Sequence, residues 1–489
     1  METENNIMKD NVVTGFLWRF LERCGAQGVA LIVSIVLARL LEPEAYGIIA
    51  IVTIFTSIMN VFIDSGLGNA LIQKKDADDL DFSTVFFFNI ILCFVLYIVM
   101  YYCAPVIATF YKMPDLTAVI RVLSITLLIS GVKNIQQAYI SRRMMFKKFF
   151  FATLGGTLIA ALVGIFMACQ GYGVWALVTQ QLVNASIDTL ILWFTVKWRP
   201  RMIFSFQRLK SLFSYGWKIL VSNIINTMYG DIRQLIIGKM YSSRDLAYYN
   251  QGKRYTEVIV NNVNVAIDSV LLPTMSKVQD NRSEVKAMTR RSIMVSTYVL
   301  APLMVGIAAT SRQLVTVLLT EKWLPSVPYL IIFCITFIFY PIHTANLNAI
   351  KAMGRSDLYL KLEVEKKIVG IILLLSTMWF GVTAMALSLL VNSIFSQIIN
   401  SWPNKKLLNY SYGEQLKDIL PSLLLSLFMG ILTWVIGYLT NFSDLVTLFI
   451  QVLLGVFIYC VGSVVSKNEA FNYVVNIIKS LIKRRNKND

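Results

Sequence analysis

Apolar runs recur along this chain from one end to the other. Fourteen can be counted, at about 13–38, 46–63, 84–108, 117–132, 150–168, 174–196, 216–238, 256–276, 292–310, 327–350, 368–380, 382–402, 419–439 and 445–465. A helix that crosses a bilayer needs about 20 apolar residues, and most of these runs approach or exceed that length. Because lipid satisfies no backbone polar group, such segments must be helical. The sequence therefore predicts an all-α polytopic membrane protein with about 14 transmembrane helices, of which the fourth and the eleventh look short.

Composition and charge distribution agree with a membrane protein. Hydrophobic residues make up 56% of the chain and charged residues 15%, against about 25% charged residues in a soluble domain. The net charge of +17 could indicate nucleic-acid binding, but 33 of the 45 Lys and Arg residues fall in segments that would be cytoplasmic if the N-terminus is cytoplasmic. The positive-inside rule expects this bias. We therefore predict cytoplasmic N- and C-termini, cytoplasmic connectors at 133–149 and 197–218, and no nucleic-acid partner.

An internal repeat relates two parts of the chain. Residues 173–184 (GVWALVTQQLVN) and 381–392 (GVTAMALSLLVN) match without gaps at Gly, Val, Ala, Leu, Val and Asn. The sixth span then corresponds to the twelfth, so both halves enter the membrane in the same direction. Parallel repeats of this kind place a substrate site at their interface in transporters. We expect two six-helix lobes around a central cavity, at 1–205 and 206–405, followed by two C-terminal helices and a basic tail at 406–489.

The first span carries charges that a simple anchor would lack. Spacings of three and four place Arg19, Glu22 and Arg23 on one side of a helix. A charge inside a span costs about 2.5–3.5 kcal/mol on insertion scales, so it normally faces protein or water and marks a pathway. The alternative is that the two arginines snorkel to the cytoplasmic headgroups. The run exceeds the apolar core of a signal peptide and lacks a small-residue cleavage site, so we expect it to be retained.

Other spans carry polar faces at helical spacing. The candidates for lining a cavity are Asp188 on the sixth span, Asn226, Asp231 and Arg233 on the seventh, and Asn264 and Asp268 on the eighth. Such side chains avoid lipid and face protein or a water-filled space. Hydrogen bonding between packed helices is the alternative for the amides, whereas the charged members favour the cavity. The single histidine, His343, is interpreted as a packing residue, and the six cysteines as small core residues.

The sequence contains no HExxH, GxSxG or Walker GxxxxGK[ST] motif. It therefore favours a transporter over an enzyme, with no cofactor and no bound metal. Without a nucleotide site, we expect transport to draw on a gradient of H⁺ or Na⁺, on the substrate gradient or on a partner.

Four stretches carry a family signature: 38–47 (ARLLEPEAYG), 64–73 (DSGLGNALIQ), 236–249 (IIGKM followed by LAYY) and 272–277 (LPTMSK). They resemble motifs of polysaccharide flippases in the MOP exporter superfamily, closest to the Wzx-type branch that serves lipopolysaccharide O-antigen, capsule or colanic-acid-like polymers. The resemblance extends over most of the chain, and the thirteenth and fourteenth spans carry little of it. It implies a MATE-like shape and a multi-pass protein of the bacterial inner membrane.

The resemblance also implies a substrate and partners. Flippases of this kind move undecaprenyl-diphosphate-linked oligosaccharide repeat units across the membrane, and their relatives have a cationic cavity that meets the diphosphate. On this basis Arg19 and Arg23 would be the leading ligands, with Arg233 across the lobe interface. Glu22 would hold an arginine in place in the empty cavity. Membrane lipid, a polysaccharide polymerase and a chain-length regulator are the other implied partners.

Two other functions stay open at this point. A MATE-like, ion-coupled exporter of small cationic drugs would favour an uncompensated acidic cavity, whereas the polar residues here are mixed and basic. A membrane polysaccharide polymerase would be expected to carry a large periplasmic loop, and the longest predicted here, 239–255, has about 17 residues.

Overall fold

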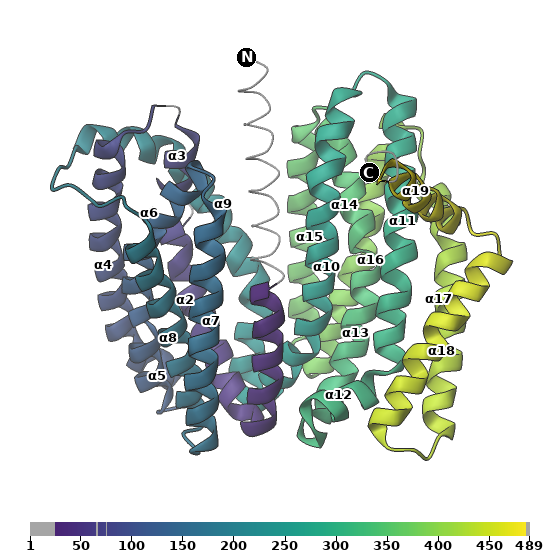
Figure 1. Cartoon of the computed structure of the whole chain (residues 1–489), viewed down its shortest axis with the longest axis horizontal. Coiled ribbons are helices and arrows are strands. Elements are labelled where there is room, and N and C mark those ends of the chain that lie inside the picture. Colours follow the sequence, from purple (N-terminus) through teal and green to yellow (C-terminus); the bar gives the residue numbers. More distant parts are fainter. Residues whose placement is uncertain (1–24, 65–66, 75, 486–489) are drawn as a thin grey trace. The chain divides into compact units, whose positions relative to one another are not determined.

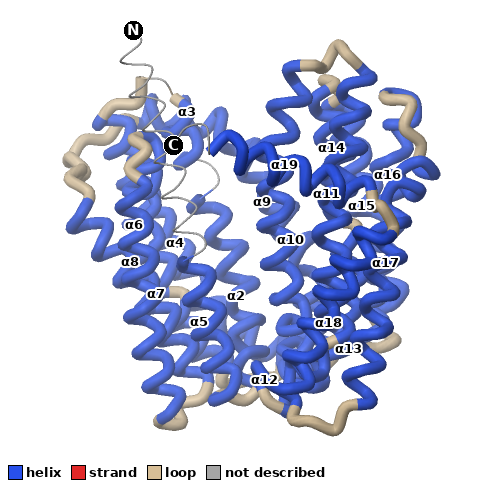
Figure 2. The backbone as a smooth tube through the Cα atoms, turned by 45° about the vertical axis from the view of Figure 1, so that its right-hand side comes forward, coloured by secondary structure: helices blue, strands red, loops and turns tan. Residues whose placement is uncertain are grey.

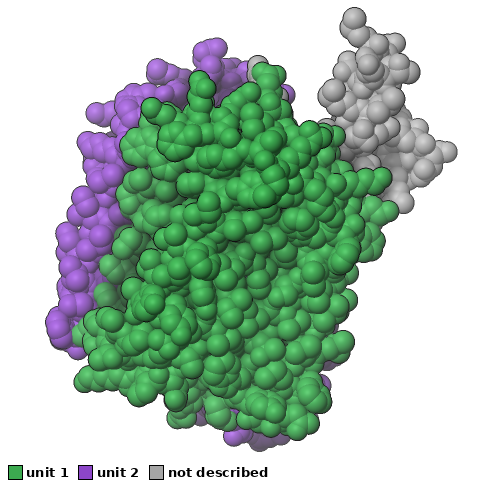
Figure 3. All heavy atoms as spheres, turned by 90° about the vertical axis from the view of Figure 1, so that its left-hand side faces the viewer, with its two compact units in different colours: residues 1–247 green, residues 248–489 purple. Residues whose placement is uncertain are grey.

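The computed structural model describes residues 25–64, 67–74 and 76–485, and the regular structure in that part of the chain is helical (Figure 1, Figure 2). The chain divides into two compact units, residues 1–247 (unit 1) and 248–489 (unit 2), coloured separately in Figure 3. Arg19, Glu22 and Arg23 lie outside the described residues.

Unit 1 is a bundle of long helices joined by turns and short connectors. Its helices are Gly25–Leu40, α2 (Pro43–Asp64), α3 (Leu67–Gln73), α4 (Asp79–Tyr111), α5 (Leu116–Leu123), α6 (Ile125–Arg142), α7 (Phe146–Cys169), α8 (Val174–Thr195) and α9 (Phe206–Met240). The next helix, α10 (Ser243–Lys277), begins in unit 1 and continues into unit 2.

Unit 2 is likewise a helical bundle. Its further helices are α11 (Arg282–Ala309), α12 (Ser311–Leu319), the 3-10 helix η1 (Glu321–Ser326), α13 (Val327–Ile338), α14 (Tyr340–Ala352), α15 (Ser356–Thr377), α16 (Val382–Leu407), α17 (Tyr412–Leu439), α18 (Asp444–Val465) and α19 (Glu469–Arg485).

The predicted number of spans is confirmed. Ten helical segments among the described residues are long and apolar enough to cross a membrane. Helix Gly25–Leu40, which is the described part of the first span, and the more polar helices α8, α9 and α15 bring the number to the predicted fourteen. The protein is therefore an all-α, multi-pass membrane protein.

Several boundaries differ from the predicted ones. The fourth span, expected at 117–132, consists of α5 and α6, which meet at Ser124 and continue to Arg142. The eleventh, expected at 368–380, begins at Ser356 as α15. Hydropathy marks only the apolar part of a helix, and the backbone hydrogen bonds continue through charged residues beyond it. For the same reason most of the predicted connectors 133–149 and 239–255 is helical.

The two matching glycines of the sequence repeat occupy equivalent turns. Gly173 precedes α8 with a φ of 55°, and Gly381 precedes α16 with a φ of 100°. Positive φ is readily adopted by glycine and disfavoured by residues with a Cβ. The repeat therefore preserves the turn that starts the sixth and the twelfth span.

The 38–47 motif forms the junction between the first two spans. Pro43 begins α2, where a missing N–H costs no helical hydrogen bond. Glu44 Oε1 lies 2.5 Å from a guanidinium nitrogen of Arg244. A Cβ on Gly47 would lie 1.8 Å from the carbonyl oxygen of Ser243, so a glycine is needed for α2 to meet the start of α10. Pro43, Glu44 and Gly47 of the motif therefore each have a structural role at this junction.

Helices α7 and α8 pack closely because α7 presents small residues to α8. The buried face of α7 includes Ala152, Gly156, Ala160 and Gly164, each four residues from the next. Small residues at this spacing let membrane helices approach closely. A Cβ on Gly156 would lie 3.1 Å from the carbonyl oxygen of Asn184 on α8.

Candidate functional site

Two predicted cavity residues, Asn264 and Asp268, lie one turn apart on α10 and contact α14. Thr344 Oγ1 donates to Asn264 Oδ1 at 3.1 Å, and Asn348 Nδ2 donates to Asp268 Oδ1 at 2.7 Å. The two partners are also four residues apart, so each turn of α10 meets one turn of α14. Asn264 is half-buried and Asp268 is exposed. The Asp268 carboxylate is therefore held in place and still accessible.

His343 lies on the same helix and contacts α16 instead. Asn400 Nδ2 lies 3.3 Å from His343 Nδ1, and Ser393 Oγ lies 3.4 Å from His343 Nε2. Because the amide can only donate at Nδ2, Nδ1 accepts, and Nε2 carries the hydrogen that it donates to Ser393. Ser393 Oγ in turn donates to the carbonyl oxygen of Thr336 at 3.2 Å. Both ring nitrogens thus have partners inside unit 2, which fits the interpretation of His343 as a packing residue.

A buried amide network lies beside His343. Asn346 Nδ2 donates to Gln415 Oε1 at 2.9 Å, and Gln415 Nε2 donates back to Asn346 Oδ1 at 3.1 Å. Asn404 Nδ2 donates to the same Asn346 oxygen at 2.7 Å. All three side chains are fully buried, where an unmade hydrogen bond would be costly. The network therefore fastens α17, the thirteenth span, to α14 and α16.

Asp188, a predicted cavity residue of α8, is buried and forms an ion pair with α6. Lys133 Nζ lies 2.6 Å from Asp188 Oδ2. Lys133 was expected at the start of the connector 133–149, but α6 extends past it and places its charge within the bundle. Asp188 Oδ1 is buried without a hydrogen-bond partner among the described residues. The charge of Asp188 is compensated inside unit 1, and its role in a cavity stays a prediction.

The three predicted site residues of α9 lie along its second half. Asn226 is exposed, whereas Asp231 and Arg233 are half-buried. Gln234 Nε2 donates to Asp231 Oδ1 at 2.9 Å, one turn along the same helix. Helix α9 packs against α2, α3 and α4. The predicted grouping of Arg233 with the arginines of the first span stays a prediction.

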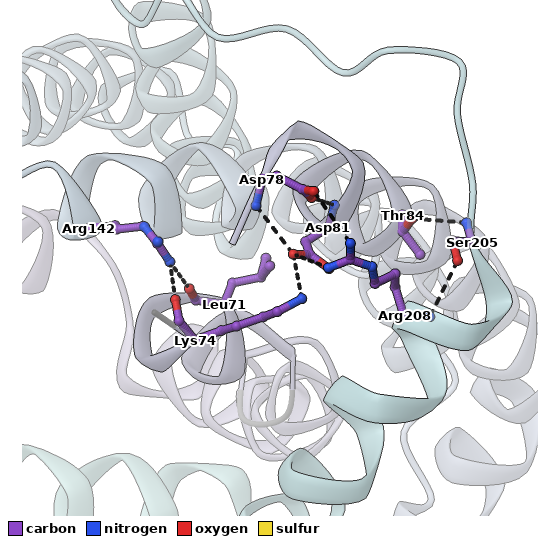
Figure 4. A network of polar contacts seen from close by, with 8 residues as sticks. All are labelled: Leu71, Lys74, Asp78, Asp81, Thr84, Arg142, Ser205 and Arg208. Carbon is purple, nitrogen blue, oxygen red and sulfur yellow. Dashed lines mark hydrogen bonds and ion pairs between the residues drawn. The ribbon is translucent and has the colours of Figure 1, made fainter. Parts of the chain in front are cut away.

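A charged cluster joins the connectors at one end of unit 1 (Figure 4). Asp81, fully buried in the first turn of α4, lies 2.6 Å from Lys74 Nζ and 3.4 Å from Arg208 Nη1 of α9. Arg142, at the end of α6, donates to the carbonyl oxygens of Leu71 at 2.8 Å and Lys74 at 2.5 Å. The predicted connectors 133–149 and 197–218 therefore meet at the same end of unit 1.

Asp78 completes this cluster as the N-cap of α4. Its Oδ1 accepts from the Asp81 N–H at 3.0 Å, and Asp81 Oδ2 accepts from the Asp78 N–H at 3.3 Å. The hydrogen bond from the Asp81 backbone, assisted by Arg208 at 3.6 Å, holds the pKa of Asp78 below its usual value. Hydrogen bonds and positive charge both favour the ionised carboxylate, so the cap is present at neutral pH.

Three polar residues of α14, Thr344, Asn346 and Asn348, were not predicted as site residues. Their signal is the sequence HTANLN at 343–348, which places four polar residues within an apolar run. Thr344 and Asn348 are four residues apart and face α10, whereas Asn346 faces α16 and α17.

The comparison with known proteins decides the family. The model of a family described as "Polysaccharide biosynthesis protein" matches residues 36–328, which include all four signature stretches. The chain belongs to this family. The resemblance to polysaccharide flippases that the motifs indicated is thereby confirmed.

Relatives of this polysaccharide biosynthesis protein extend over most of its length. It is 25% identical over 401 residues to the teichuronic acid biosynthesis protein TuaB of Bacillus subtilis, covering 80% of each chain. It is 22% identical over 440 residues to the lipopolysaccharide biosynthesis protein WzxC of Escherichia coli, covering 87% of this chain and 88% of WzxC. Its fold is similar to that of the lipid II flippase MurJ in an inward closed conformation, with a TM-score of 0.73, 15% identity, and coverage of 93% of this chain and 98% of MurJ.

Proposed function

We propose that the protein is a flippase that moves undecaprenyl-diphosphate-linked oligosaccharide repeat units across the bacterial inner membrane for surface polysaccharide synthesis. The main support for this proposal is that the chain belongs to a polysaccharide biosynthesis family and forms helices long enough to cross a membrane. Polar side chains between these helices are held in place by hydrogen bonds, as Asp268 is by Asn348. The fold similarity to a lipid II flippase supports it, as does the similarity to WzxC along nearly the whole chain. Movement by alternating access follows from the two-lobed repeat that the sequence predicts.

The diphosphate would be met by the arginines of the first span. Coulomb attraction between unit charges at 4 Å is about 4 kcal/mol at an effective dielectric near 20, enough to offset part of the desolvation of a diphosphate. Arg19 and Arg23 offer two planar, bidentate guanidinium groups for its oxygens. Glu22 would neutralise an arginine when no substrate is bound, and Arg233 would add a further cation.

The sugars would be met by neutral and acidic groups. Asp268 suits a sugar hydroxyl because its carboxylate is oriented by Asn348 and remains exposed. Asn264 is oriented in the same way by Thr344. Side chains that are already held in place lose less freedom on binding, which favours affinity. Coupling to a gradient of H⁺ or Na⁺, and cooperation with a polysaccharide polymerase and a chain-length regulator, belong to the same proposal.

Deletion of the gene tests the proposal. We expect the lipid-linked repeat unit to accumulate in the cytoplasmic leaflet, where a glycosidase added to spheroplasts cannot reach it. Repeat units that are accessible from outside but unpolymerised would favour a polymerase. Unchanged lipid intermediates together with increased sensitivity to cationic drugs would favour a MATE-like exporter. Complementation with the wild-type gene is the control for all three outcomes.

A further inference from the structure

The connector between α8 and α9 has a backbone that is fixed to unit 1. The Arg201 N–H donates to Ser83 Oγ at 3.0 Å. The Ser205 N–H donates to Thr84 Oγ1 at 3.1 Å (Figure 4). Trp198 is buried in the core cluster at this end of the unit. The connector is thus attached along its length to α4 and to the core, and its exposed side chains are presented from a fixed backbone.

Large apolar side chains are exposed along this fixed segment. The exposed fraction is 90% for Met202, 51% for Phe204 and 72% for Phe206. Exposed apolar groups that lie close together mark an interaction surface or a membrane contact. The last turn of α8, a membrane-length helix, also exposes a large apolar side chain, because Phe194 is 85% exposed.

Basic side chains flank these apolar ones on both sides in the sequence. Lys197, Arg201 and Lys210 are exposed, and the side chain of Arg201 is 70% exposed although its guanidinium lies 3.4 Å from Asp79. Arg199 has a different role, because its guanidinium donates to carbonyl oxygens at the end of α8, including that of Val196 at 2.5 Å. Three exposed basic side chains therefore lie next to the apolar ones in the sequence, and one of them, Arg201, is also paired with Asp79.

We propose that this segment binds anionic phospholipid headgroups of the leaflet that it faces. The lipid-binding surface consists of the basic residues Lys197, Arg201 and Lys210 and the apolar residues Met202, Phe204 and Phe206. Exposed apolar side chains beside Lys and Arg are typical of segments at a membrane interface, where the apolar groups enter the acyl boundary and the basic groups meet the headgroups. Its position directly after a membrane-length helix favours lipid over a soluble protein partner (Figure 1). The predicted cytoplasmic side agrees, because the cytoplasmic leaflet carries the anionic lipids that attract basic segments.

Native mass spectrometry of the full-length protein in detergent, titrated with phosphatidylglycerol or phosphatidylcholine, tests this proposal. Each Lys or Arg near an anionic surface contributes about 1 kcal/mol, which is about fivefold in affinity. The triple variant K197Q, R201Q, K210Q should therefore lose at least tenfold in phosphatidylglycerol affinity at low salt, and keep its affinity for phosphatidylcholine. The matched control K361Q, R312Q, K405Q removes two lysines and one arginine that are exposed elsewhere and should leave both affinities unchanged.

The apolar part of the surface gives an independent result. The variant M202S, F206S should weaken binding of both lipids alike, because acyl contacts do not depend on the headgroup. K197Q alone should lower phosphatidylglycerol affinity about fivefold, which provides a test if the triple variant misfolds. Equal affinity of the wild type for the two lipids, or undiminished phosphatidylglycerol binding by a folded triple variant, would overturn the proposal. Neither outcome bears on whether the protein translocates oligosaccharides.

Discussion

Separation of Lys133 from Asp188 should destabilise unit 1 strongly. Lys133 Nζ and Asp188 Oδ2 lie 2.6 Å apart, and the side chains are 23% and 10% exposed. At that distance the Coulomb attraction is about 6 kcal/mol at an effective dielectric near 20, and desolvation of the two ions offsets much of it. Removal of one partner leaves the other charge uncompensated, which costs about 3–5 kcal/mol. Lys133→Met and Asp188→Asn should each show a loss of this size.

Thermal unfolding of the purified protein measures this loss. One kcal/mol corresponds to about 2–4 °C in Tm for a unit of this size, so each single variant should fall by on the order of 10 °C. The double variant Lys133→Met, Asp188→Leu removes both ions and should recover most of the loss, because a buried ion pair can be replaced by apolar residues at little cost. A wild-type Tm in either single variant, or a double variant as unstable as the singles, would refute the reasoning.

The same double variant separates a structural role of Asp188 from a role in the cavity. If Asp188 serves only to pair with Lys133, a stable double variant should support normal amounts of surface polysaccharide. If Asp188 also contacts the substrate, the double variant should be stable and fail to export. Protein levels in the membrane must match the wild type for either comparison.

Three further predictions concern the first span, the topology and the α7–α8 contact. Arg23→Ala should sharply reduce surface polysaccharide at an unchanged protein level. Arg23→Lys should retain part of the polysaccharide, since lysine keeps the charge but lacks the bidentate guanidinium. Normal polysaccharide in an Arg19→Ala, Arg23→Ala variant would contradict a role of these arginines in export. Reporter fusions after Lys148 and at the C-terminus should both behave as cytoplasmic, and a periplasmic signal from the tail fusion alone would mean an odd number of spans. Gly156→Val should destabilise the protein by about 1–3 kcal/mol in thermal unfolding because its side chain meets the α8 backbone. Gly28→Val, which has open space, is its control.

The number and order of spans could be predicted because a run of about 20 apolar residues has few alternatives to crossing a membrane. The ends of the helices could not be predicted from the sequence. The fourth span breaks at Ser124 and then continues through Lys133 to Arg142, and the eleventh begins at Ser356. In each case the helix continues through polar residues beyond its apolar part. Lys133 is paired with Asp188, and a hydropathy profile does not record such partners.

The site could be predicted to the level of single helices. The spacing of Asn264 and Asp268 shows that they share a face of α10, since residues four apart lie one turn apart. Their partners Thr344 and Asn348 are 80 residues away in the sequence. The helical period shows which residues share a face of α10, but it does not show which other helix packs against that face. The sequence likewise places Lys133 in a connector, because only the packing of α6 against α8 reveals its partner Asp188.

Translocation itself is measured most directly in proteoliposomes that contain the purified protein and an undecaprenyl-diphosphate-linked oligosaccharide with a fluorescent terminal sugar. A membrane-impermeant glycosidase is added outside, and the released fluorophore reports the fraction of lipid that reaches the outer leaflet. We expect release to rise beyond the outer-leaflet fraction of protein-free vesicles toward the whole pool, and Arg23→Ala to slow that rise. Release that stays at the protein-free level, with folded wild-type protein and an intact vesicle barrier, would contradict the proposed flippase function.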